Sequence, residues 1–195
     1  MNPPLHALRL VARVLLGAGC LSLGYGAYVV SSAKAYQAIE MRRFEETKEH
    51  VAPTPALSEG VSIGEIQIPR LGLTALVVQG DSEAVLRHAV GHLADTALPG
   101  EPGNIVLAGH RDTFFRPLKR VRAGDAITLR TRDGDFEYLV ESTAVVRPTD
   151  LDVIQPTDRP TLTLITCFPF YYVGPAPDRF IVRANLRSVA IRKGG

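Results

Sequence analysis

Glycine and proline interrupt this chain so often after residue 50 that they leave little room for long helices there. The 195 residues include 17 glycines and 14 prolines, most of them beyond that point. The apolar and β-branched runs between them are short, as in Ile105 to Ala108 and Thr161 to Cys167. Such runs, bounded by turn residues, indicate short strands with hairpin connections. We therefore expect a mainly β fold, a closed or nearly closed barrel with a few short helices.

The run pattern also places the individual elements. Ser82 is a candidate N-cap for a short helix through Leu86, and one or two helical turns are expected near residues 115–121. Asp133-Gly134 is a hairpin turn signal. Strands are expected near residues 63–68, 74–79, 104–108, 126–130, 136–146, 162–167 and 179–186.

Residues 14–33 form an apolar stretch without a charged side chain, about long enough to cross a bilayer core. The stretch is longer than the apolar region of a usual signal peptide, and Lys34 spoils the nearest cleavage motif. We expect an uncleaved transmembrane anchor after a short tail at residues 1–13. A helical stalk and linker should follow at residues 34–60, and a catalytic domain at residues 61–190.

Charge and cysteine content narrow the function classes. The net charge is +2, and the basic residues do not cluster, so no nucleic-acid partner is expected. Cys20 falls in the apolar stretch and Cys167 far from it, so a disulfide framework is not expected. Cys167 is thus a lone thiol of the folded part. Taken alone, it reads more readily as a buried structural cysteine than as a reactive one.

Three side chains at strand ends change that interpretation. Cys167 ends one run, His110 follows another, and Arg179 opens the last. A thiol needs a base or a cation nearby to become a nucleophile, and a histidine supplies either near neutral pH. A guanidinium offers several donors to a developing oxyanion. The three residues together are what covalent acyl transfer requires.

The order and the flanking residues of this trio resemble the sortase family. The matching motifs are Ala108-Gly109-His110-Arg111-Asp112, Thr163-Leu164-Ile165-Thr166-Cys167 and Arg179-Phe180-Ile181-Val182. The Gly91-His92 region and Cys167-Phe168-Pro169-Phe170 resemble class D sortases in particular. The resemblance runs from about Val61 to Leu186.

The resemblance implies a sortase-type barrel and a cysteine transpeptidase that cuts a Leu-Pro-x-Thr-Gly-like sorting signal after its Thr. Cys167 would form the thioacyl intermediate, His110 would transfer protons, and Arg179 would bind the oxyanion. Thr166 and His92 are candidate substrate-binding residues, with strand packing an equal alternative for Thr166. The implied partners are a surface protein that carries the signal and an amine acceptor such as cell-wall peptide. The implied location is the bacterial cytoplasmic membrane, crossed once, with the catalytic domain outside the cytoplasm.

Several alternatives bear on the site. His88 and His92 have the spacing of two metal ligands on a helix, but Gly91 interrupts that helix and no third ligand is evident. No metal site and no cofactor are therefore expected, although the resemblance leaves calcium activation open. Asp112 stands too close to His110 in sequence to orient it, so we expect a structural or surface role.

Two further functions compete with transpeptidation. A cysteine peptidase would pass the same thioester to water, and the sequence barely separates it from a transpeptidase. A non-catalytic barrel used for binding is disfavoured because Cys167, His110 and Arg179 are all present. Papain-like enzymes place Cys before His, and L,D-transpeptidases usually carry His-Gly just before Cys, so neither pattern fits.

Overall fold

The structure is a computed structural model that describes residues 13, 15–25, 28, 57–172 and 174–192. Residues 13, 15–25 and 28 are helical, and their side chains are exposed. Within these described ranges no helix is both long enough and apolar enough to cross a membrane. Much of the expected anchor, namely residues 14, 26–27 and 29–33, lies outside the described residues, as does the expected stalk over 34–56.

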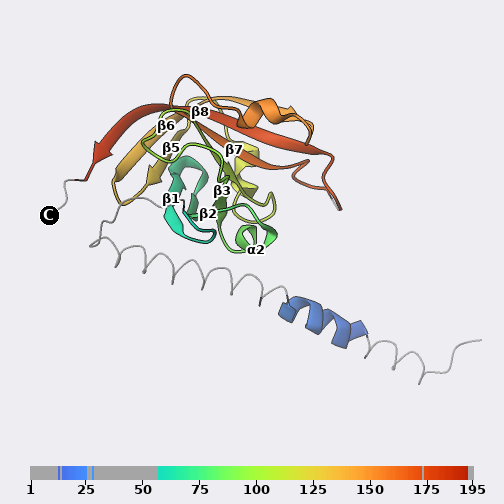
Figure 1. Cartoon of the computed structure of the whole chain (residues 1–195). Helices are drawn as coiled ribbons and strands as arrows, with labels where there is room; N and C mark the ends of the chain where they lie inside the picture. The colour runs from blue at the N-terminus through green and yellow to red at the C-terminus, as the bar shows by residue number, and fades with distance from the viewer. Residues whose placement is uncertain (1–12, 14, 26–27, 29–56, 173, 193–195) are drawn as a thin grey trace, which may run out of the picture.

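The folded domain consists of six short strands, two long strands and four brief helical segments, drawn in Figure 1. The strands are β1 (Ser62–Ile68), β2 (Leu73–Gln79), β3 (Val90–His92), β4 (Asn104–Ala108), β5 (Ala126–Arg130), β6 (Gly134–Val146), β7 (Thr161–Phe168) and β8 (Asp178–Ile191). The helical segments are η2 (Pro69–Leu71), α2 (Glu83–Leu86), η3 (Arg116–Arg120) and η4 (Leu151–Ile154).

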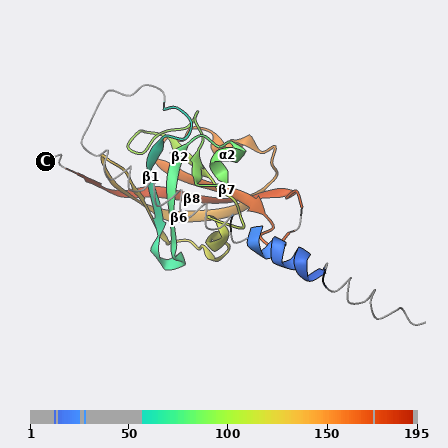
Figure 2. The ribbon, with the colours of Figure 1, turned by 90° about the horizontal axis from the view of Figure 1, so that it is seen from below.

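The strands close into a barrel in the order β1-β2-β3-β4-β7-β8-β6-β5. The β2–β3 and β4–β7 pairs are parallel, and the other pairs are antiparallel. The long strands β6 and β8 lie side by side along one wall, and Figure 2 shows them behind β1 and β2. The expected mainly β, closed barrel is confirmed.

Alternating side chains fill the barrel. In β1, Ile66 and Ile68 are fully buried, while the neighbouring Glu65 and Gln67 are half-buried, as expected for a strand with one face on the core. Strand β7 departs from this pattern because Thr163 is buried between the buried pair Leu162 and Leu164. Its outer face is therefore covered too, and the cover bears on the site described below.

The barrel closes where β1 meets β5, and Gly64 makes this contact sterically possible. A Cβ atom at this position would lie 2.2 Å from the carbonyl oxygen of Arg130. No real side chain tolerates that approach, so a residue without Cβ is required where the two backbones meet. The closure thus depends on a single residue of β1.

Local signals explain the ends of several elements. The Ser82 side chain accepts a hydrogen bond from the Val85 amide at 3.3 Å, as an N-cap of α2 should. At the β5–β6 turn, the Thr131 hydroxyl donates to the Gly134 carbonyl oxygen at 3.0 Å. Strand β3 and segment η4 were not expected from the sequence, and β8 continues beyond its expected end at residue 186 to Ile191.

Candidate active site

Cys167 lies near the end of β7, directly opposite Arg179 of β8 in the antiparallel ladder. Directly opposed residues of a ladder project from the same face of the sheet. The core residues Leu162 and Leu164 occupy the inner face, so alternation places Cys167 on the outer face. Its thiol is free and partly exposed, which suits a nucleophile that must meet a substrate.

His110 is brought to the same level by the neighbouring parallel strand. Ala108 at the end of β4 pairs with Ile165 of β7, and the Gly109 amide donates to the Ile165 carbonyl oxygen at 3.1 Å. His110 is thus two residues beyond Ala108, just as Cys167 is two residues beyond Ile165. The imidazole is 31% exposed, so it is reachable from solvent.

The backbone around His110 is held from two sides. The Thr166 hydroxyl donates to the Gly109 carbonyl oxygen at 2.7 Å, and the Phe115 amide donates to the His110 carbonyl oxygen at 3.0 Å. A Cβ atom on Gly109 would lie 2.9 Å from the fully buried Phe115 ring. Glycine therefore lets the chain pass close to the core just before the imidazole.

The Arg179 guanidinium is tethered by its own loop, and among the described residues only its Nη1 is hydrogen-bonded. Its Nη1 donates to the carbonyl oxygens of Asp178 at 3.0 Å and Ala176 at 3.4 Å. A guanidinium carries five N–H donors in a rigid fork. The remaining donors can therefore serve an oxyanion formed beside Cys167.

His110, Cys167 and Arg179 all line one groove of about 460 Å³ on the outside of the barrel. Residues 146–148, 150–151 and 153–154 contribute much of one wall, and Asp81, Glu83 and Leu86 contribute to another. The lining carries the carboxylates of Asp81, Glu83 and Asp150 as well as the guanidinium groups of Arg147 and Arg179. Glu83 Oε1 lies 3.9 Å from His110 Nε2. The structure therefore brings the three predicted catalytic side chains together in one groove.

A buried amide holds the wall that η4 belongs to. Asn104 donates to the carbonyl oxygens of Val153 and Gln155, both at 3.1 Å, and accepts from the Thr163 hydroxyl at 2.7 Å. These bonds explain why Thr163 is buried on the outer face of β7. Sequence reasoning missed Asn104, although a lone polar residue at the start of a buried apolar run was a usable signal.

The structure places Thr166 and His92 differently from the three predicted catalytic residues. Thr166 also lines the groove, but it is only 2% exposed and its hydroxyl is bonded to Gly109. His92 is 1% exposed and does not line the groove. The geometry therefore gives Thr166 a strand-linking contact and gives no support to the prediction of His92 as a substrate-groove residue.

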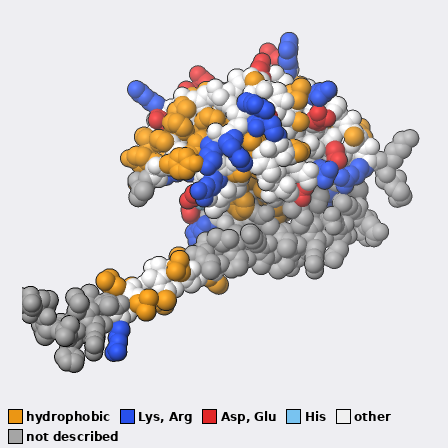
Figure 3. Space-filling view, turned by 180° about the vertical axis from the view of Figure 1, so that it is seen from behind, with side chains coloured by type: hydrophobic (Ala, Val, Ile, Leu, Met, Phe, Trp, Pro, Cys, Tyr) orange, Lys and Arg blue, Asp and Glu red, His pale blue; other side chains and the backbone are white. Residues whose placement is uncertain are grey.

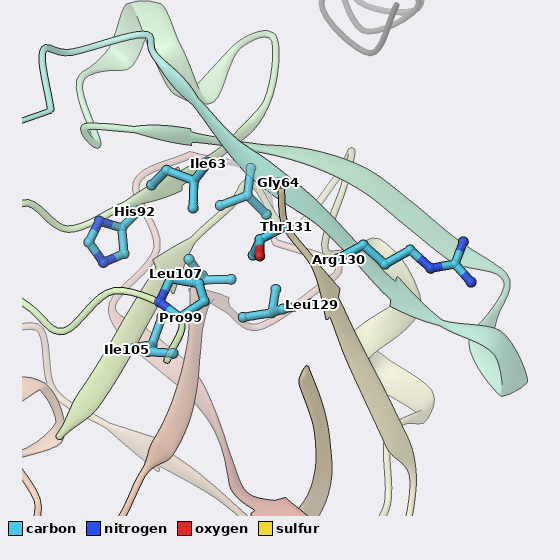
Figure 4. Close-up of a pocket in the computed structure, with 10 residues that line it drawn as sticks. Ile63, Gly64, His92, Pro99, Ile105, Leu107, Leu129, Arg130 and Thr131 are labelled. Atoms are coloured by element: carbon cyan, nitrogen blue, oxygen red, sulfur yellow. The ribbon is translucent and has the colours of Figure 1, made fainter. Parts of the chain in front are cut away.

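His92 instead borders a separate apolar cavity of about 10 Å³ inside the barrel, which Figure 4 shows with Pro99, Leu107 and Leu129 around it. Its Nδ1 lies 2.9 Å from Gln79 Oε1, and its Nε2 lies 2.9 Å from the Ala97 carbonyl oxygen. Burial lowers the pKa of His92. A buried, fully partnered imidazole of this kind is a core residue.

The structure also bears on the expectations for a metal site and for Asp112. In the part of the chain that the structure describes, no three His, Cys, Asp or Glu side chains gather in a way that could hold a metal ion. His92 belongs to strand β3, so the helix on which a His88–His92 ligand pair would sit does not form. Asp112 is exposed, as expected.

A closed β-barrel that lines one groove with a thiol, an imidazole and a guanidinium has the equipment of a cysteine acyl-transfer enzyme. Comparison with known proteins defines the family. The model of the family described as Sortase domain matches residues 66–187. The chain therefore belongs to the sortase family, and it is a cysteine transpeptidase.

Individual relatives agree with this assignment. Sortase D of Bacillus subtilis (strain 168) is 30% identical over 190 residues, covering 89% of this chain and 96% of the relative. The solved Sortase D5 transpeptidase of Clostridium perfringens superposes with a TM-score of 0.70 at 28% identity, covering 79% of this chain and 99% of that one. Sortase E1 of Streptomyces coelicolor, solved with a tripeptide in its active site, gives 0.62 at 29% identity, covering 68% and 92%. The predicted likeness to class D sortases is confirmed.

Proposed function

We propose that this chain is a membrane-anchored sortase that cleaves a Leu-Pro-x-Thr-Gly-like sorting signal after Thr and joins the new carboxyl end to an amine. The observation that carries the proposal is the register of β7 with its two neighbours. That register sets Cys167 opposite Arg179 and level with the residue that follows Gly109, which is His110. All three side chains line the same groove.

The first half of the reaction forms a thioester between the peptide and Cys167. The Cys167 thiolate attacks the Thr carbonyl carbon, and the carbonyl oxygen becomes an oxyanion that the free N–H groups of Arg179 stabilise. When the C–N bond to Gly breaks, protonated His110 donates its proton to the leaving amine. The peptide up to Thr remains on Sγ of Cys167.

The second half releases the product. The incoming amine attacks the thioester carbonyl carbon and loses a proton to the now neutral His110. The C–S bond then breaks, which restores the thiolate and leaves a new amide bond. Water as the acceptor would instead give a free carboxylate, and that is the competing peptidase reaction.

Incubation of the full chain with a Leu-Pro-x-Thr-Gly peptide and a primary amine tests this reaction. Mass spectrometry should find the peptide acylated on Cys167 and, at the end, a product that contains the amine. Cys167→Ala should give neither species, and Cys20→Ala should behave like the wild type. Cleavage with only a free carboxylate as product would make the chain a peptidase, and binding without cleavage would make it a non-catalytic barrel.

The proposed location can be tested separately. The uncharged stretch over residues 14–33 supports a single membrane anchor, and an exported substrate requires residues 61–190 outside the cytoplasm. A membrane-impermeant maleimide should therefore label Cys167 on intact cells that express the Cys20→Ala chain. Labelling only after lysis would contradict the proposed orientation.

A further inference from the structure

Arg111, the residue after His110, makes contacts that the proposed chemistry does not explain. Its Nη1 donates to the Pro169 carbonyl oxygen at 3.0 Å. Its Nη2 donates to the carbonyl oxygens of Tyr172 at 2.8 Å and Gly174 at 3.1 Å. The guanidinium carbon also lies 5.8 Å from the centre of the Tyr172 ring. One side chain thus binds three carbonyl groups of the β7–β8 connection.

These contacts connect the segment that follows β7 to the turn that carries His110. The connection runs from the end of β7, one residue after Cys167, to the start of β8, one residue before Arg179, and Arg111 is covalently next to His110. Backbone carbonyls outside a regular strand need donors from elsewhere, and a forked guanidinium supplies several at once. The side chain therefore fixes the path of residues 169–172 relative to the turn that carries His110.

The side chains of this segment divide into an anchored part and an exposed part. Phe170 packs edge-on against Phe168 and Phe180, with ring centres 6.0 and 5.2 Å away. Tyr171 and Tyr172 are 76% and 47% exposed, although both lie close to a cation. Figure 3 shows hydrophobic side chains gathered at one end of the folded domain beside Lys and Arg side chains. Neither tyrosine lines the groove itself, but large exposed aromatic rings on the segment that follows β7 are suited to contact a bound peptide.

We propose that Arg111 is a positioning residue, which holds residues 169–172 as a wall for substrate binding beside Cys167 without taking part in the chemistry. The inference rests on the proposed function for the identity of the bound peptide. Without the three hydrogen bonds, residues 169–172 should open locally, while the barrel, Cys167 and His110 stay in place.

The test compares three variants of the full chain. Arg111→Ala removes all three hydrogen bonds and the charge. Arg111→Lys keeps the charge but has one compact ammonium in place of the fork. Arg116→Ala is the matched control, because Arg116 is an exposed cation that acts on Tyr171 only through its charge. Each variant is measured by amide hydrogen exchange of residues 170–172, by iodoacetamide alkylation of Cys167 and by sorting-peptide cleavage.

For Arg111→Ala we expect exchange in residues 170–172 to rise about tenfold or more, and kcat/KM for the peptide to fall about tenfold or more, mainly through KM. Alkylation of Cys167 should stay within about twofold of the wild type, because the small reagent does not use the wall. Arg111→Lys should recover only part of the loss. Arg116→Ala should match the wild type in all three measurements.

Unchanged exchange in Arg111→Ala would overturn the proposal, and so would full recovery by Arg111→Lys. A parallel loss of alkylation and cleavage would also overturn it, because it would mean general damage to the site. If the wild-type chain cleaves no sorting peptide, the proposed function fails. The exchange and alkylation rates then still decide whether Arg111 holds the segment.

Discussion

At the scale of single residues, the meeting of Cys167 and Arg179 is a product of strand register and not of chain proximity. The two residues are far enough apart in sequence that only the β7–β8 ladder makes them direct neighbours. A shift of the register by one residue would turn one of them to the opposite face. The sequence predicted both residues as candidates, because each stands at one end of a strand-like run. It could not give the distance between their side chains in the fold.

Arg179→Ala should lower kcat by about 10²–10³-fold, or about 3–4 kcal/mol, because an oxyanion donor is lost from the groove. Arg179→Lys should recover little, since an ammonium does not reproduce the fork. Steady-state kinetics with the sorting peptide would measure both variants. Arg187→Ala is the control, since Arg187 pairs with Glu137 on the surface and does not line the groove. Near-normal kcat in Arg179→Ala would remove Arg179 from the proposed mechanism.

His92 shows what a sequence motif leaves open at this scale. Its position in a motif similar to class D sortases made it a candidate substrate-binding residue. The deciding facts are its 1% exposure and its bonds to Gln79 and Ala97, and both depend on tertiary packing. No local pattern in the sequence carries that information.

At the scale of elements, strand β7 organises the site through two hydroxyl contacts to β4 and the residue that follows it. Its Thr166 hydroxyl reaches the chain just beyond β4, and Thr163 reaches the Asn104 amide that holds the wall containing η4. Both threonines belong to the same run that ends at Cys167. The strand therefore carries the nucleophile and also fixes the elements around it.

Thr166→Val should reduce cleavage, because the buried Gly109 carbonyl loses its hydroxyl donor just before His110. The stability cost should be about 1–3 kcal/mol, measured by urea unfolding. Thr166→Ser is the control, since it keeps the hydroxyl, and it should retain most of the activity. If Thr166→Val and Thr166→Ser behave alike, the hydroxyl does not hold the His110 turn.

Asn104→Ala should destabilise the domain by about 1–3 kcal/mol, because two carbonyl groups and one hydroxyl lose their partner. It should also raise KM for the sorting peptide, because the groove wall that contains η4 is released. Urea unfolding and peptide kinetics would separate the two effects. Thr163→Val removes only one of the three bonds, so its effect on KM should be smaller. An unchanged KM in Asn104→Ala would show that the wall is held by other contacts.

The sequence predicted those elements whose apolar runs are long enough to show a period. Strands β4 and β5 were predicted with the bounds that the structure has. Strand β3 has only three residues around Gly91, which is too short for a pattern. The last residues of β8 are largely exposed and become a strand by pairing with the start of β6, so their order comes from a distant partner.

At the scale of the whole molecule, an ion pair ties together parts of the barrel that are distant in sequence. Arg70 of η2 forms a two-pronged salt bridge with Asp125, just before β5, and also donates to the Arg120 carbonyl oxygen at 2.7 Å. The Asp125 side chain is 3% exposed and the Arg70 side chain 37%, so one end of the pair is well protected from solvent. The hydrogen bond from Arg70 lowers the pKa of Asp125.

Asp125→Asn should lower the stability at pH 7, because the ionised carboxylate of the folded state loses its pairing with Arg70. A lowered pKa in the folded state contributes stability above the ordinary carboxyl value of about 3.9, and this is lost as the pH falls through the folded value. The difference between wild type and variant should therefore be full at pH 7 and shrink below about pH 4. Urea unfolding at several pH values measures it, with the exposed Asp95→Asn as control. A difference that is constant with pH would contradict this assignment.

The closed strand order of the described barrel has a consequence for how binding preferences can diverge. A closed sheet offers no open edge, so a bound peptide cannot extend it as an additional strand. The backbone of a bound peptide must therefore contact the irregular segments beside the groove, namely the one containing η4 and the β7–β8 connection. Those segments can therefore exchange residues under selection while the ladder that aligns the reacting groups stays untouched. Exchanging these segments between related barrels should transfer the peptide preference, and the reaction itself should remain the same.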